Sequence, residues 1–157
     1  MRCVVQRVLG ASVTVDGKET ARIGPGLLVL VGVASGDGRN DTEWMSRKLI
    51  NMRLWTDDKG KPWNKSVKDK DLEILLVSQF TLMGYMKGNR PDFHLAMGSM
   101  SSESTYITFG KECAKKYSAK KIQSGEFGAY MNVSLINDGP VTMVLDSKHR
   151  SGRADIE

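Results

Sequence analysis

The stretch "GLLVLVGV" at residues 26–33 decides the fold. Every residue from Leu27 to Val31 is apolar, so both faces of an extended strand would carry side chains that avoid water. A strand of this kind lies at the centre of a sheet and is covered on both sides. The Gly-Pro-Gly sequence at 24–26 makes a turn before it. We therefore expect a sheet built around this segment.

Further strands are expected on both sides of the central one. Alternating or continuous apolar residues, bounded by turn signals, mark each of them. The first two form a hairpin with a turn signal at Asp16-Gly17, and the last two flank the sequence "NDGPVT" at 137–142. The expected strands cover residues 3–8, 11–15, 72–83, 129–137 and 141–146.

Two amphipathic helices are also expected. The first covers residues 40–55, with Asn40 as its N-cap, and the second covers 102–118. Charged residues over 56–71 and the glycine-bearing sequence over 84–94 predict surface loops. The order of strands, helix, strand, helix and strands favours an α+β fold, with an antiparallel or mixed sheet and two main helices packed on it.

The composition is that of a globular protein with a mild positive charge. The chain has 157 residues, and its net charge of +5 suits a polyanionic partner without requiring one. One domain over residues 1–147 and a disordered tail over 148–157 are expected. The longest apolar run is far shorter than the roughly 18 residues of a membrane span, and the first residues lack the zones of a signal peptide. The sequence therefore predicts a cytoplasmic protein with no membrane contact.

The residues that usually carry catalysis are scarce. Cys3 and Cys113 stand apart from other metal-ligating residues, so we expect them in the core and expect no metal site. His94 is interpreted as a surface or capping residue, and His149 lies in the expected tail. No glycine pattern of a phosphate-binding loop occurs, and the sequence predicts no cofactor.

Two segments are unusual. In "SQFTL" at 78–82 an apolar strand suddenly carries polar side chains, which indicates either a strand end at the solvent or a site. In "NDGPVT" the residue types favour a hairpin corner. An X-Pro bond is also the place where a cis peptide costs least, so a Gly-Pro step can present two carbonyl oxygens in one direction. Local chemistry leaves both questions open.

These two segments resemble the signature motifs of the D-aminoacyl-tRNA deacylases. "MRCVVQRV" at 1–8, the central strand, "KGNRPDF" at 87–93 and "FGAYMNVSLINDGPVT" at 127–142 resemble family segments in the same order, so the resemblance covers nearly the whole chain. It implies a small β-barrel-like sheet and a homodimer with active sites at its interface. It also implies hydrolysis of the ester that joins a D-amino acid to the 3′ terminal adenosine of tRNA, which is chiral proofreading. Tyr130 suggests a eukaryote-like member.

The resemblance also implies roles for particular residues. Ser78, Gln79, Phe80 and Thr81 are expected to line the catalytic pocket, with the Gln79 side chain or the N–H groups of Phe80 and Thr81 facing the oxyanion. The Gly139-Pro140 bond is expected to be cis and to enter the other subunit's active site, where it excludes L-amino acids. Glycine, which has no side chain, is expected to pass this filter.

Supporting roles are implied for four further residues. Asn137 belongs to the chiral-selection motif, and Arg7 is expected to steady the Gly-Pro loop. Lys87 and Phe93 are expected to contact the terminal adenosine or its phosphates, and the alternative for them is a solvated lysine and a packed loop aromatic. The absence of a histidine base favours attack by water, assisted by the 2′-hydroxyl of the terminal ribose, over attack by Thr81.

Two other functions remain as alternatives. A noncatalytic RNA-binding β-module would keep the scaffold without the chemistry, but both motifs are intact. An esterase that acts on another small acyl ester is disfavoured because the chain offers no histidine-based triad.

Overall fold

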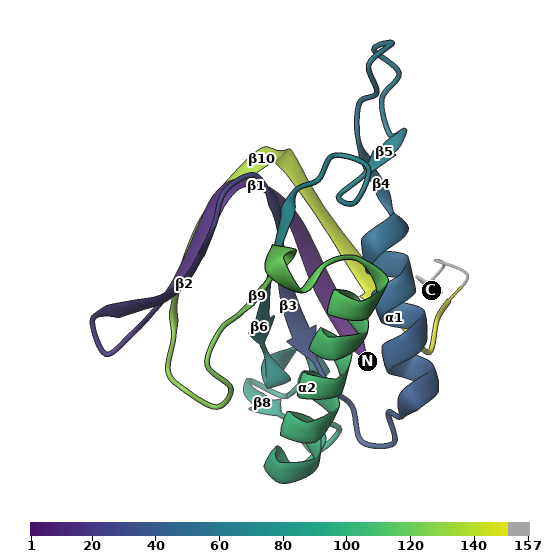
Figure 1. Ribbon diagram of the computed structural model, residues 1–157. Coiled ribbons are helices and arrows are strands. Elements are labelled where there is room, and N and C mark those ends of the chain that lie inside the picture. The colour runs from purple at the N-terminus through teal and green to yellow at the C-terminus, as the bar shows by residue number, and fades with distance from the viewer. Residues whose placement is uncertain (151–157) are drawn as a thin grey trace.

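One mixed sheet organises the protein. The computed structural model describes residues 1–150, and in it the strands follow the order β10-β1-β3-β6-β9, with β2 paired to β1. These strands are β1 (Arg2–Val15), β2 (Lys18–Ile23), β3 (Gly26–Gly32), β6 (Glu73–Ser78), β9 (Ile122–Ser124) and β10 (Asn132–Asp146). The predicted central strand is β3, which pairs with β1 antiparallel and with β6 parallel. The sheet curls into a nearly closed, barrel-like form (Figure 1).

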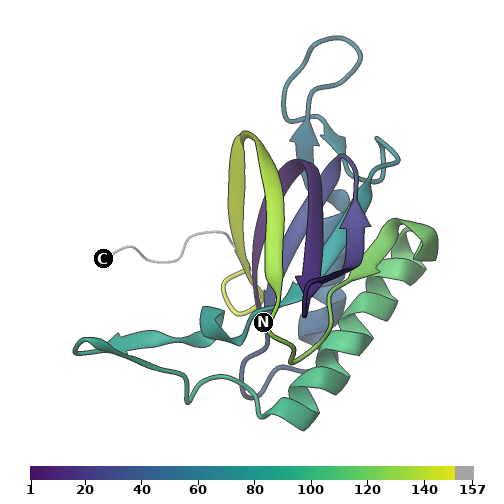
Figure 2. The same cartoon turned by 90° about the vertical axis from the view of Figure 1, so that its left-hand side faces the viewer.

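Both faces of the central strand are buried, as its sequence predicts. Leu27, Val29 and Val31 belong to the larger core, together with apolar residues of the two helices, while Leu28 belongs to a second core on the other face. The helices α1 (Arg39–Asn51) and α2 (Ser99–Lys116) cover the first face (Figure 2). The long strands β1 and β10 fold over the second face. The α+β fold with two main helices is therefore confirmed.

Short elements lie outside this sheet. Two two-stranded ribbons extend from it, and two 3₁₀ turns follow strand β6 and helix α2. They are β4 (Arg53–Trp55) with β5 (Lys65–Ser66), β7 (Tyr85–Lys87) with β8 (Arg90–Asp92), η1 (Phe80–Met83) and η2 (Ala119–Lys121). Within the described residues, no helix is both long enough and apolar enough to cross a membrane.

The strand boundaries differ from the sequence-based ones. Residues 3–8 and 11–15 form one continuous strand, and the hairpin partner across Asp16-Gly17 is β2. The segments on both sides of "NDGPVT" likewise belong to one strand, β10, so the hairpin corner that its residue types favour does not form. In both cases β1 and β10 pair on either side of an irregularity, and the ladder resumes after it instead of ending at a turn.

Two further boundaries are corrected. The helix expected at 40–55 begins after Gly38 and ends at Asn51, because the Gly38 N–H donates to Asp41 Oδ2 at 2.9 Å and β4 begins at Arg53. Asn40 is therefore not the N-cap. The strand expected at 72–83 ends at Ser78, after which the chain turns into η1.

The chain start is locked into the fold by charge. The α-ammonium group of Met1 lies 2.6 Å from Asp37 Oδ2, and both groups are fully buried. It also donates to Ser147 Oγ, whose hydroxyl in turn donates to Asp41 Oδ1 at 2.6 Å. Lys148 Nζ donates to Asp41 Oδ2 at 2.9 Å, so the expected tail begins with a residue held against α1. The rest of that expected tail, 151–157, lies outside the described residues.

Candidate functional site

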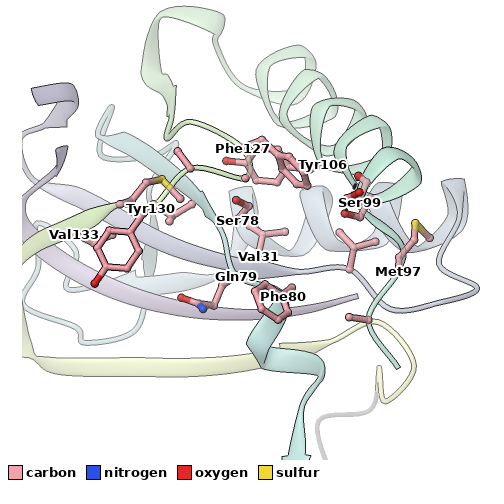
Figure 3. A pocket seen from close by; sticks show the side chains of 17 residues that line it. Val31, Ser78, Gln79, Phe80, Met97, Ser99, Tyr106, Phe127, Tyr130 and Val133 are labelled. Carbon is pink, nitrogen blue, oxygen red and sulfur yellow. Dashed lines mark hydrogen bonds between the residues drawn. The ribbon is translucent and has the colours of Figure 1, made fainter. Parts of the chain in front are cut away.

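A cavity of about 580 Å³ opens where the parallel strands β3 and β6 end. Strand β6, the first half of α2 and the segment after β9 each supply a wall, and Figure 3 shows their side chains around one space. The lining residues include Val31, Val33, Val77, Ser78, Gln79, Phe80, Met97, Ser99, Ser102, Tyr106, Phe127, Tyr130, Met131 and Val133. The wall is mostly apolar, with a few hydroxyl and amide groups, as is usual for small-molecule sites.

The end of β6 gives the pocket its polar floor. The Gln79 N–H donates to Val31 O at 2.8 Å, which extends the ladder by one residue before η1 begins. Gly32 makes this turn fit, because a Cβ there would lie 2.9 Å from the Leu82 Cβ. Ser78 and Gln79 are thus held at the pocket by backbone geometry.

The other two residues of the "SQFT" group differ in their place: Phe80 lines the edge of the pocket, and Thr81 lies outside its lining. Phe80 is 59% exposed and packs edge-to-face on Phe93, with ring centroids 5.1 Å apart. The Gln79 Nε2 donates to Thr81 Oγ1, and Thr81 does not line the cavity. An aromatic pair and a bound threonine hydroxyl therefore stand at the border of the pocket.

The pocket offers no general base. Among the described residues, its lining contains no histidine, carboxylate, lysine or cysteine side chain. Burial raises the pKa of Tyr106 to about 12, although a hydrogen bond with Ser124 opposes the shift. Its hydroxyl, which is protonated at neutral pH, donates to Leu76 O at 2.9 Å. Proton transfer in this pocket cannot depend on an ionised side chain of its wall.

The Gly139-Pro140 segment forms a bulge inside β10. Gln6 pairs with Thr142 and Val8 pairs with Asn137, so Arg7 on β1 stands opposite four residues, 138–141, on β10. The Gly139-Pro140 bond is cis. The expectation of a cis bond is therefore met, and the proline's missing N–H falls outside the ladder.

The two expected supporting residues hold this bulge. Asn137 Nδ2 donates to Thr142 Oγ1 at 2.9 Å, and Asn137 Oδ1 accepts from the Val141 N–H at 3.0 Å, which closes the loop across its neck. Arg7 Nε lies 3.2 Å from both the carbonyl oxygen and a carboxylate oxygen of Asp138. Arg7 Nη1 also donates to Leu54 O. These hydrogen bonds of Arg7 and Asn137 therefore hold the backbone of the bulge in place.

The bulge and the pocket of one chain lie far apart. Asn137 is level with Val8, Gly26 and Glu73, at the start of β6, whereas Ser78 ends that strand. The five residue steps from Glu73 to Ser78 span about 16 Å, and the three strand spacings from β10 to β6 add about 14 Å sideways. In Figure 1 the middle of β10 lies at the top of the sheet, and β8, which follows η1, lies at the bottom.

Neither of the two residues expected at the adenosine lines the pocket. Phe93 supports Phe80, and Lys87 is exposed on the β7–β8 ribbon. His94 is also on this exposed segment, where Asp92 Oδ1 lies 2.6 Å from its Nδ1. Cys3 and Cys113 are buried in the core as expected, and burial raises the pKa of the Cys113 thiol to about 12.

Sequence reasoning missed the opposite wall of the pocket. Met97, Ser99 and Ser102, at the start of α2, and Met131 belong to it. Tyr106 is buried on the inner face of α2, and that face also borders the cavity. The apolar spacing of α2 does not distinguish a core contact from a pocket wall.

The fold and the pocket together define the class of protein: an α+β protein with a mostly apolar pocket at the end of two parallel strands. A family model described as D-Tyr-tRNA(Tyr) deacylase matches residues 4–146. The chain belongs to this family of hydrolases, as the resemblance of its two motifs implied.

Individual relatives agree with the family assignment. D-aminoacyl-tRNA deacylase 1 of Mus musculus is 50% identical over 147 residues, which cover 94% of this chain and 70% of the relative. D-aminoacyl-tRNA deacylase of Dictyostelium discoideum is 46% identical over 151 residues, which cover 96% and 100%. A solved structure of a c-Myc DNA Unwinding Element Binding Protein superposes with a TM-score of 0.90 at 50% identity, covering 93% of this chain and 98% of that one.

Proposed function

We propose that this protein hydrolyses the ester bond of D-aminoacyl-tRNA and releases the free D-amino acid and tRNA. Residues 1–147 would be the deacylase domain, acting in the cytoplasm as a homodimer. The observation that carries the proposal is the pocket itself. Its polar floor is the Ser78-Gln79 end of β6, and it lies in a chain about half identical to curated deacylases.

Chiral selection in this proposal comes from a second copy. Gly139 and Pro140 of the partner would enter the pocket and leave no room for the side chain of an L-amino acid, while glycyl-tRNA would pass. Two features support this. The bulge is braced by Arg7 and Asn137, so it resists displacement, and it is too distant from its own chain's pocket to act there.

The exposed edge of the sheet supports the homodimer. Among residues 1–150, strand β10 has a neighbour on one side only, and several large apolar side chains near it are exposed. They are Leu9, Ile136, Met143 and Val144. An exposed apolar edge strand of 15 residues favours pairing with a second surface.

The chemistry would rely on position and dipoles. Phe80 and Thr81 are the first two residues of the 3₁₀ turn η1, and the first N–H groups of such a turn have no acceptor within it. Together with Gln79 they would stabilise the oxyanion, and one such donor is worth about 10²- to 10³-fold in rate. Water would attack, assisted by the 2′-hydroxyl of the terminal ribose, since the pocket wall offers no base.

The decisive experiment compares release of D-Tyr and L-Tyr from the same tRNA at low enzyme concentration. We expect hydrolysis of the D-ester only. Equal rates, or no hydrolysis of either ester, would contradict the proposal.

The nucleophile is tested separately. Thr81→Ala should keep most of the activity, and a tRNA that ends in 2′-deoxyadenosine should be a poor substrate. If Thr81→Ala abolishes turnover without loss of binding or of the fold, a threonine nucleophile replaces water.

A further inference from the structure

A lysine cluster at the C-terminal end of α2 has no role in the pocket. The segment 111–121 contains five lysines and one glutamate, so it accounts for most of the net charge of +5. We call these five residues the lysine patch: Lys111, Lys115, Lys116, Lys120 and Lys121. Lys68 of a neighbouring loop adds a sixth amine, since its Nζ lies 3.5 Å from the Lys116 carbonyl oxygen.

Only part of the lysine patch is used within the fold. Lys116 pairs with Glu112, and Lys121 Nζ lies 3.2 Å from Asp71 Oδ2. Among residues 1–150, no carboxylate lies within 4 Å of the amines of Lys111, Lys115 or Lys120, and all three side chains are exposed. These three amines are free to bind an anion.

Helix stabilisation explains the patch only in part. Cations in the last turn of a helix interact favourably with its dipole, which accounts for Lys115 and Lys116. Lys111 lies a turn earlier, and Lys120 lies beyond the helix in η2. Like charges held this close repel one another, so helix stability does not explain why Lys111 and Lys120 belong to the cluster.

The patch lies within reach of the pocket. Phe127 of the pocket wall follows Lys121 by six positions in the chain, and six residue steps span at most about 20 Å. Helix α2 itself runs from Ser99 at the pocket to Lys116, about 26 Å at 1.5 Å per residue. In Figure 1 the lower end of α2 lies near β8, and the chain returns from its upper end to β9. A ligand that fills the pocket and extends along α2 would pass over the lysines.

We propose that the lysine patch binds the phosphate backbone of the acceptor arm of a tRNA whose 3′ end occupies the pocket. This inference rests on the proposed function, which supplies a polyanion at that pocket. Lysines contact phosphates as point charges and read no sequence, so the patch would serve any tRNA with a D-aminoacyl end. It adds affinity and orientation and takes no part in ester cleavage.

The test compares two triple variants of equal charge. The first is Lys111→Gln, Lys115→Gln and Lys120→Gln. The control is Lys18→Gln, Lys59→Gln and Lys61→Gln, which removes three exposed lysines at the start of β2 and in the β4–β5 excursion. In Figure 1 the β1–β2 turn and the tip of the β4–β5 excursion both project away from α2. Thermal unfolding establishes that both variants fold.

Binding of uncharged tRNA is measured between about 50 and about 200 mM salt. Each phosphate contact adds roughly 0.9 to the salt slope, so the patch variant should lower the slope by about 2 to 3 and weaken binding roughly tenfold or more. The control should stay within about twofold of the wild type. Equal slopes for wild type and patch variant would overturn the inference, and so would equal losses in both variants. Weaker binding of the patch variant to phosphatidylserine vesicles, with an unchanged tRNA slope, would assign the patch to a membrane and overturn it too.

Hydrolysis separates this inference from the proposed function. The patch variant should have a KM for D-Tyr-tRNA roughly tenfold higher at unchanged kcat, and unaltered hydrolysis of D-tyrosyl-adenosine, which lacks the acceptor arm. If the wild type hydrolyses neither ester, the proposed function fails and the binding series still decides the contact. If the wild type hydrolyses both and the patch variant matches it on both, only the inference about the patch fails.

Discussion

Asp37→Asn should destabilise the protein far more than loss of a surface ion pair. The Asp37 carboxylate lies 2.6 Å from the Met1 α-ammonium, and neither group is exposed. Removing one partner of a buried pair costs about 3–5 kcal/mol, because the remaining charge is left in a medium that solvates it poorly. We expect the lower end, about 3 kcal/mol, since an asparagine oxygen can still accept from the ammonium and from the Ala34 N–H.

The expected change is measurable by thermal unfolding. For a chain of this size each kcal/mol shifts Tm by about 2–4 °C, so Asp37→Asn should lower Tm by about 6–12 °C at neutral pH. The matched control is Asp71→Asn, because the Asp71 side chain is 80% exposed and its pair with Lys121 should shift Tm by at most about 4 °C. The protein used for this measurement carries no N-terminal tag, so that the Met1 α-ammonium is free to pair with Asp37. A loss for Asp37→Asn no larger than that of the control would refute the argument.

Three further substitutions test the fold and the site. Burial alone would raise the pKa of Asp41, but hydrogen bonds from Lys148, Ser147 and the Gly38 N–H hold it below its usual range. The ionised Asp41 carboxylate therefore stabilises the folded state fully at pH values above about 4, the ordinary pKa of an aspartate, and this stabilisation is lost as the pH falls toward the lower pKa of the folded state. Asp41→Asn should make Tm less sensitive to acid. Tyr106→Phe should cost about 1 kcal/mol, because it removes the hydrogen bonds of the hydroxyl with Leu76 O and Ser124 Oγ, although Leu76 O still accepts from the Gly125 N–H; deacylation should stay within a few-fold, and a far larger loss of rate would show a chemical role for the hydroxyl. Arg7→Met should loosen the 138–141 bulge and lower the ratio of D-ester to L-ester hydrolysis; an unchanged ratio in a folded variant would remove Arg7 from chiral selection.

The apolar patterns predicted the sheet framework, because a strand that is apolar on both faces must lie in the interior of the sheet. The sequence of β3 required a central position, and the register places it between β1 and β6. Strand ends were less predictable. Asp, Gly and Pro at 138–140 indicate a turn by local chemistry, but β1 pairs with β10 on both sides of them and keeps them in one strand. Long-range pairing overrode local preference there.

The polar residues at the end of β6 drew attention to Ser78 and Gln79, but they fit a solvent-exposed strand end as well as a site, and only the resemblance of "SQFTL" to a family motif implied a pocket there. Met97 and Tyr106 gave no signal, since apolar residues of a helix look the same in a core and in a pocket wall. The brace formed by Arg7 has no local signal either. Its partners, Leu54 and Asp138, are 47 and 131 residues away along the chain.

The separation of pocket and bulge sharpens what the resemblance implied. Two motifs that act on one substrate would be expected to lie close together, yet the register holds Asn137 level with the start of β6 and Ser78 at its end. No side-chain movement spans about 16 Å of rigid sheet. Either the motifs act separately, or a second copy brings its bulge to this pocket. Since the bulge is braced and β10 is an exposed edge, we favour the second copy, and measurement of oligomeric state beside deacylation in an Ile136→Asp variant tests it. That variant should lose self-association and activity together, and a fully active monomer would overturn the cross-subunit site.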